Sequence, residues 1–194
     1  MIAIKKFKLT AISPLMQSNP QSMESSGPTD DGKIRVNKKT VYDDKHEAEI
    51  RCYQQDGKFV HPSMSFRAGL LKAGSGKKFG KLFATSLVES GVHVHNEFEE
   101  ILDLKGKPVK AYEIDKRSVI VGKARVMRCR PKFREWTMVV ELEIDDEYIA
   151  LDQVVDLLNV MGSKVGLGEY RPERDSAKGL KGSGNYGRFR AELA

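Results

Sequence analysis

The chain has 194 residues, of which 40% are hydrophobic and 31% are charged. This balance indicates a soluble globular protein with one well-buried core, and no apolar run is long enough to span a bilayer. The net charge of +6 and the pI of about 9.2 favour an anionic partner, but they carry no information about sequence specificity.

The first residues and the cysteines argue against three further classes of protein. The opening Met1-Ile-Ala-Ile-Lys-Lys lacks the cation-first order of a signal peptide, so we expect a cytoplasmic protein. Cys52 and Cys129 have no ligand-like spacing, which leaves redox and metal-ribbon proteins without support. We expect both cysteines to be buried thiols, and the sequence predicts neither a cofactor nor a metal site.

The chain begins with a predicted strand over residues 2–12, in which Phe7, Leu9 and Ala11 share one face. Residues 13–40 are rich in Ser, Asn, Pro, Gly and Asp and show little periodicity. A stretch of this length without regular structure is unusual inside a compact domain, so we expect a long functional loop or finger.

A short strand, a turn and a helix are predicted next. Residues 48–53 alternate like a strand, and residues 54–58 have the composition of a turn. The helix is expected to start with Ser63 as its N-cap and to end at Gly74. Its core-facing residues, at helical spacing, are Phe66, Leu70 and Ala73.

Residues 74–81 superficially resemble a phosphate-binding loop, because glycines alternate with lysines. The segment lacks the GxxxxGK[ST] motif and follows a helix instead of opening one, which argues against nucleotide hydrolysis. We expect Lys77 and Lys78 to touch a phosphate backbone instead.

Residues 86–95 are predicted to form a strand with His93 and His95 on one face. Two histidines on one side of a strand are a possible start of a metal site, but no third ligand has a recognisable spacing. We therefore interpret the pair as part of a half-exposed polar face.

The clearest strand pair covers residues 119–130 and 133–144, which we predict to form a hairpin. In the second strand, alternate residues from Trp136 onward are apolar. The tip carries Arg130 and Lys132, which either bind phosphates or only solubilise a sheet edge.

The last third of the chain combines a helix with a loop of glycines and cations. The helix is predicted over residues 151–161, and Gly162 is expected to end it. The loop and closing strand contain Lys164, Gly166, Gly168, Arg171, Arg174, Lys178, Gly179, Lys181, Gly182, Gly184, Gly187, Arg188 and Arg190. Backbone N–H groups at glycines approach a ligand closely, and the strand sets a basic face with Tyr186 and Arg188 against an apolar one. The alternative is a flexible surface loop with solvated charges.

Without the insertions, the predicted order is strand, helix, strand, strand, helix, strand. This order is that of an α+β, ferredoxin-like (RRM-like) fold, with an antiparallel four-stranded sheet and two helices on one face. RNA-binding versions hold their ligand on the open sheet face and loops. We expect one domain over residues 1–194, with insertions at about 13–57 and 75–117.

Short motifs in three parts of the chain, in a fixed order, resemble one protein family. Residues 59–71 read FVHPSMSFRAGLL at the start of the first helix, and residues 13–15 end the first strand. Residues 165–168 and 184–189 provide a glycine-rich loop and a closing strand. In this order they resemble the RAMP superfamily (repeat-associated mysterious proteins) of CRISPR effectors.

The resemblance implies a subunit that binds guide RNA through its backbone and polymerises along it in a ribonucleoprotein complex. The implied partners are single-stranded guide RNA, other copies of the chain, other effector subunits and a target RNA or DNA, but no membrane. A finger that kinks the RNA would be residues 13–40 or 75–117. Together with the basic residues above, the candidate RNA-binding set is Ser63, Ser65, Arg67, Lys77, Lys78, Arg130, Lys132, Lys164, Gly166, Gly168, Arg171, Arg174, Lys181, Tyr186 and Arg188.

Two other functions stay open. The same fold fits a phage-type single-stranded DNA-binding protein of replication or recombination. Because some members of the resembled family cleave RNA, an endoribonuclease that uses an aspartate within residues 30–44 or His61 is the third hypothesis. No catalytic residue is assigned, since spacing places no paired acid and base.

Overall fold

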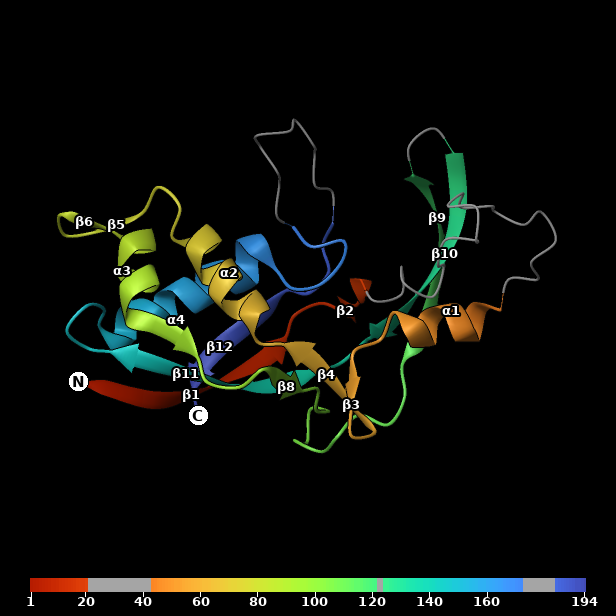
Figure 1. Ribbon diagram of the computed structural model, residues 1–194, viewed down its shortest axis with the longest axis horizontal. Coiled ribbons are helices and arrows are strands. Elements are labelled where there is room, and N and C mark those ends of the chain that lie inside the picture. Colours follow the sequence, from red (N-terminus) through yellow and green to blue (C-terminus); the bar gives the residue numbers. More distant parts are fainter. Residues whose placement is uncertain (21–42, 122–123, 173–183) are drawn as a thin grey trace, which may run out of the picture.

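The computed structural model describes residues 1–20, 43–121, 124–172 and 184–194, with side chains except at positions 120, 121 and 124–126 (Figure 1). Of the two candidate fingers, most of the first, residues 21–40 of 13–40, lies outside this description, whereas residues 75–117 are described. The longer strands are β1 (Ile2–Ala11), β4 (Lys58–Pro62), β9 (Glu113–Val121), β10 (Ala124–Phe133), β11 (Thr137–Asp145) and β12 (Phe189–Leu193). The shorter strands are β2 (Leu15–Met16), β3 (Gln54–Gln55), β5 (Lys78–Phe79), β6 (Leu82–Phe83), β7 (Val92–Val94) and β8 (Phe98–Glu100). The helices are α1 (Asp44–Ile50), α2 (Met64–Ala73), α3 (Ala84–Gly91) and α4 (Leu151–Val160), and α4 runs into a π-helical turn (Met161–Val165).

The central sheet has the strand order β12-β1-β11-β7, and each neighbouring pair is antiparallel. Helix α2 lies between β1 and β7 in the chain, and α4 lies between β11 and β12. Counted along the frame strand, helix, strand, strand, helix, strand, this is the spatial order 4-1-3-2 of a ferredoxin-like fold. The predicted α+β, ferredoxin-like class is confirmed.

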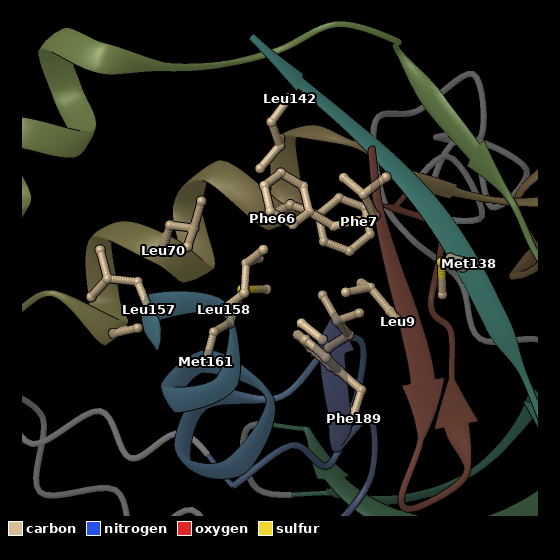
Figure 2. Close-up of a cluster of buried hydrophobic side chains, with 14 of the residues drawn as sticks. Phe7, Leu9, Phe66, Leu70, Met138, Leu142, Leu157, Leu158, Met161 and Phe189 are labelled. Atoms are coloured by element: carbon tan, nitrogen blue, oxygen red, sulfur yellow. The ribbon is translucent and has the colours of Figure 1, made fainter. Parts of the chain in front are cut away.

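The core lies between this sheet and the helices α2, α3 and α4, which cover one face of it (Figure 1). Figure 2 shows side chains from both layers pointing toward one another. Those labelled there are Phe7, Leu9, Phe66, Leu70, Met138, Leu142, Leu157, Leu158, Met161 and Phe189, all of which are buried. Burying each such side chain contributes roughly 1.5–3 kcal/mol, so this layer supplies most of the driving force for folding.

Helix α2 begins and ends where the sequence predicts. Ser63 is its N-cap residue and Gly74 its C-cap residue. The Ser63 hydroxyl makes no capping hydrogen bond, however; the Ser65 hydroxyl instead donates to the carbonyl of Pro62 at 2.7 Å.

Two segments predicted as strands are helical. Residues 48–53 were expected to be a strand, but α1 occupies Asp44–Ile50, with Asp43 accepting hydrogen bonds from its first turn. Residues 86–95 are mostly α3, and only β7 joins the sheet. The buried residues of α3 are Ala84, Leu87, Val88 and Gly91, whose spacing is helical and not alternating.

The predicted hairpin of residues 119–130 and 133–144 is wrong. β10 pairs with β9, whereas β11 pairs with β1 and β7. The expected tip at Pro131 lies within β10, opposite Ile114. β11 lies inside the central sheet between β1 and β7, and its apolar face is buried in the core under the helical layer. The β9–β10 pair, with α1 packed on it, forms an arm that extends from the central sheet (Figure 1).

The predicted end of the last helix at Gly162 is also wrong. The chain stays helical through Val165 and turns at Gly166, which has φ +74°. Gly162 is needed for a different reason, because β12 passes close beside it. No helix in the described ranges is long and apolar enough to cross a membrane.

Candidate nucleic-acid interface

A groove runs along the seam between α2 and the π-helical turn. Its first part is a hollow of about 130 Å³ lined by residues that include Ser65, Gly69, Lys72, Gly166, Gly168 and Arg171. Its second part is a wider hollow of about 520 Å³ whose lining includes Lys72, Lys77, Lys164 and Val165. Because Lys72 and Val165 line both hollows, the two adjoin each other, and we call them together the basic groove.

Small residues of α2 allow this groove to form. Gly69 faces the π-helical turn, where a Cβ would meet the Met161 side chain at 2.3 Å. Ser65 and Lys72 are seven residues apart, two helical turns, so they lie on the same side of α2. The close approach therefore sets Ser65 and Lys72 beside Gly166 and the turn.

The charged residues that line the basic groove are all cations: Lys72, Lys77, Lys164 and Arg171. Lys77 forms an ion pair with Asp156, and Arg171 donates to the carbonyl of Gly168 at 2.9 Å. The Lys164 side chain is exposed and has no ion pair within the described ranges. The groove thus carries an excess of positive charge suited to a phosphate backbone.

The described parts of the glycine loop, residues 166–172 and 184–187, are held by hydrogen bonds to each other and to residues 14–16. Leu167 N–H donates to Gly187 at 3.0 Å, and Tyr186 N–H donates to Tyr170 at 3.0 Å. Glu169 N–H and Gly187 N–H donate to carbonyls in residues 14–16. The expectation that loop amides face a ligand does not hold for these four N–H groups, because they donate to carbonyls of the protein. The loop would therefore contact a ligand through its side chains.

Two glycines explain why this loop needs small residues. A Cβ at Gly168 would stand 2.1 Å from the carbonyl oxygen of Met16, and one at Gly187 would stand 1.9 Å from that of Leu167. Both residues have positive φ values of 67°. Their role is close backbone packing in a conformation that L side chains rarely adopt.

Tyr186, expected to face a nucleic-acid strand, contacts the arm. The Arg117 guanidinium lies 5.3 Å from the ring centroids of both Tyr170 and Tyr186. It also donates to the Tyr186 hydroxyl at 2.6 Å and pairs with Asp115 at 2.6 Å. The hydrogen bond to Asp115 raises the pKa of Arg117. This cluster joins the glycine loop to the base of the arm.

Several other predicted site residues have partners within the fold. Arg67 donates to the carbonyls of Val92 and Glu89, at the end of α3. Lys78 lies 4.5 Å from the ring of Phe83. Neither cation is among the residues that line the basic groove.

The remaining predicted residues lie near the arm and the closing strand. Arg130 is buried, with a 3.6 Å contact to Glu169, and Lys132 pairs with Glu113 at 2.9 Å. The backbone N–H of Arg188 donates to the Ser13 hydroxyl, and its guanidinium donates to Asn185. Ser63 is fully buried. Arg174 and Lys181 lie outside the described residues.

The open face of the central sheet is a poor platform for bases. Cross-strand polar contacts occupy it: the ion pairs of Lys6 with Glu141 at 2.6 Å and of Lys8 with Glu192 at 3.7 Å, and a contact of His95 with Glu143 at 2.9 Å. Base stacking requires exposed aromatic rings. No exposed Phe, Tyr or Trp lies on this face in the described strands, so the basic groove is the better candidate.

His61, the histidine considered for catalysis, is buried at 3% exposure beside Gln17, Tyr53 and Phe66. Burial lowers its pKa to about 4, so the ring is neutral at physiological pH. The two cysteines are also buried, and burial raises the pKa of each thiol to about 12. Within the described part of the chain, no cluster of three His, Cys, Asp or Glu residues is arranged to hold a metal ion.

Sequence reasoning missed Lys72, Tyr170 and Arg117. Lys72 had a usable signal, because it follows Ser65 by seven residues on a predicted helix. Arg117 and Tyr170 had none, since their contact joins segments more than fifty residues apart in the chain.

The described residues define a ferredoxin-like α+β protein with a cationic groove beside its helical layer. No protein-family model matches the sequence, and no curated protein matches it either. Among solved structures, the chain is similar to Cmr6 from Pyrococcus furiosus, with 10% identity over 99% of this chain and 98% of that one. The TM-score is 0.47, so this likeness does not assign the chain to a family.

Proposed function

We propose that this protein is a non-enzymatic subunit that binds single-stranded RNA along the basic groove. The observation that carries the proposal is the adjacency of the two hollows, which share Lys72 and Val165 and whose charged lining residues are Arg171, Lys72, Lys164 and Lys77. Lysines act on phosphates as point charges, so such a lining binds a polyanion without reading its bases.

The finer part of the proposal rests on the RAMP-like order of motifs in the sequence. The ligand is then a guide RNA, and several copies of the chain bind along it within a ribonucleoprotein effector complex with other subunits. In such complexes, base pairing by the RNA supplies sequence specificity, and the protein needs only backbone contacts. Light scattering with and without single-stranded RNA tests this part, since assembly raises the mass in steps of one protein chain.

Fluorescence anisotropy with labelled single-stranded RNA, over a series of salt concentrations, tests binding itself. We expect log affinity to fall linearly with log salt, with a slope of about −0.7 per phosphate contact. The Lys72→Gln/Lys164→Gln variant should bind less tightly and with a shallower slope than the control Lys58→Gln/Lys105→Gln, which removes two exposed cations elsewhere. Absence of binding at low salt, or affinity independent of salt, contradicts the proposal.

Competition between RNA and DNA of the same sequence identifies the ligand class. A protein of the proposed type prefers RNA, because the 2′-hydroxyl distinguishes the two. Preference for DNA would favour the alternative of a single-stranded DNA-binding protein.

A further inference from the structure

Two arginines stand directly opposite each other on the arm. Arg117 of β9 and Arg128 of β10 are register partners, so their side chains leave the same face of the ladder. Their side chains are 42% and 30% exposed. Like charges in this position repel each other, and Asp115 beside Arg117 and Glu47 beside Arg128 offset part of this repulsion.

Two further arginines lie behind this pair. The side chains of Arg51 and Arg130 are only 11% and 10% exposed. Burial, and then the nearby charge of Arg128, lower the pKa of Arg51. The Nε atoms of both residues, and Nη1 of Arg130, are buried with no hydrogen-bond partner within the described ranges. Their charge is therefore incompletely compensated by the protein.

The acids in this corner do not balance the four guanidiniums. A single oxygen of Glu47 lies 3.4 Å from Arg51 and 3.3 Å from Arg128, so two cations share it. Among the described residues, the other carboxylates in contact with the arginines are Asp115 and Glu169. Within the same residues, four cations against three anions leave an excess of one positive charge, and Arg117 and Arg128 are the most exposed of the four arginines.

The glycine loop places this corner next to the basic groove. Arg171 lines the groove, and its neighbour Tyr170 contacts both Arg117 and Arg130 through its ring. A nucleic-acid strand that leaves the basic groove at Arg171 therefore meets the arm on the other side of Tyr170.

We propose that Arg117 and Arg128 bind a phosphate group of the same single-stranded nucleic acid, so that the strand contacts the arm as well as the groove. Planar guanidiniums suit bidentate contacts to phosphate oxygens, and Arg51 and Arg130 strengthen the positive potential from behind. This inference rests on the proposed function and extends its binding surface beyond the helical layer.

The test is the same salt-dependent anisotropy with full-length protein, labelled single-stranded RNA and two arm variants. Arg117→Gln/Arg128→Gln should weaken binding about tenfold near 0.1 M salt and reduce the slope by about 1. Arg117→Lys/Arg128→Lys keeps both charges and should retain the wild-type slope. The control Lys58→Gln/Lys105→Gln loses the same charge away from the arm. Emission of Trp136, a buried residue and the one tryptophan in the chain, checks that each variant is folded.

Two results would overturn the arm site while leaving the groove proposal intact. In the first, Arg117→Gln/Arg128→Gln binds like the control while the Lys72→Gln/Lys164→Gln variant is weakened. In the second, the lysine and glutamine arm variants lose affinity equally, which indicates a structural role for the arginines. Failure of the wild-type protein to bind single-stranded RNA or DNA contradicts both proposals together.

Discussion

The carbonyl oxygen of Phe189 lies so close to Gly162 that a Cβ at position 162 would stand 2.1 Å from it. This approach lets β12 join the sheet edge while the π-helical turn stays packed on the other side. The contact between Gly162 and Phe189 helps to position the basic groove, because the π-helical turn that contains Gly162 also carries the groove residues Lys164 and Val165.

Substituting Gly162 should therefore destabilise the protein. Gly162→Ala forces β12 or the turn to move, and overpacking of this kind costs about 1–3 kcal/mol or more. The control Gly80→Ala adds a methyl group where nothing lies within 4 Å, so it costs only the strain of a φ of 61°. Denaturant unfolding followed by Trp136 emission measures both; equal stability of the two variants would contradict the packing explanation.

Arg67 should act in stability and not in RNA binding. Its hydrogen bonds to Val92 and Glu89 satisfy carbonyls at the end of α3. Arg67→Gln should cost about 1–2 kcal/mol in unfolding free energy and leave RNA affinity within twofold. Lys72→Gln, on the same helix, should lower RNA affinity, because Lys72 lines the basic groove. A large loss of affinity in folded Arg67→Gln protein would return Arg67 to the binding surface that the RAMP resemblance implies.

His61 should make stability depend on pH. Its folded pKa is lowered to about 4 from 6.5, so between these values the unfolded state binds more protons. Stability from this group is complete above about pH 6.5 and is lost as the pH falls through 4, by at most about 3 kcal/mol. The curve of His61→Gln should be flatter in this window.

Glu99 makes stability change with pH in the opposite direction, so its contribution must be separated from that of His61. Burial raises the pKa of Glu99, so the folded state holds the proton more tightly and stability falls as the pH rises through that range. Subtracting the unfolding curve of His61→Gln from that of the wild type isolates the histidine. A difference that does not vary with pH would show that His61 is accessible to protons in the folded state.

The sequence predicted the elements whose pattern is local. The alternation of Phe7 and Leu9 in β1, and the helical spacing of Leu70 in α2 and Leu158 in α4, each reflect burial against one layer. These elements, with the closing strand, were sufficient to predict the ferredoxin-like class. The second strand was placed at residues 119–130 instead of at β7, and the third strand was assigned the wrong hairpin partner.

Long-range pairing escaped the same reasoning. Nothing local indicates that β10 pairs with β9, since Pro131 looks like a turn residue when its neighbours are unknown. The contact between Arg117 and Tyr186 depends on that pairing and was missed with it. The sequence predicted single residues of the basic groove but not the groove itself, because Ser65, Lys77 and Gly168 belong to separate segments that tertiary packing brings together.

Lysine acetylation footprinting with and without single-stranded RNA tests the central claim most directly, because one sample contains both the site and its controls. The basic groove predicts that RNA protects Lys72, Lys77 and Lys164 from acetylation, while Lys6 and Lys8 on the open sheet face react as in free protein. Protection of Lys6 and Lys8 with unchanged reactivity of the groove lysines would contradict the account, because the RNA would then lie on the open face of the central sheet.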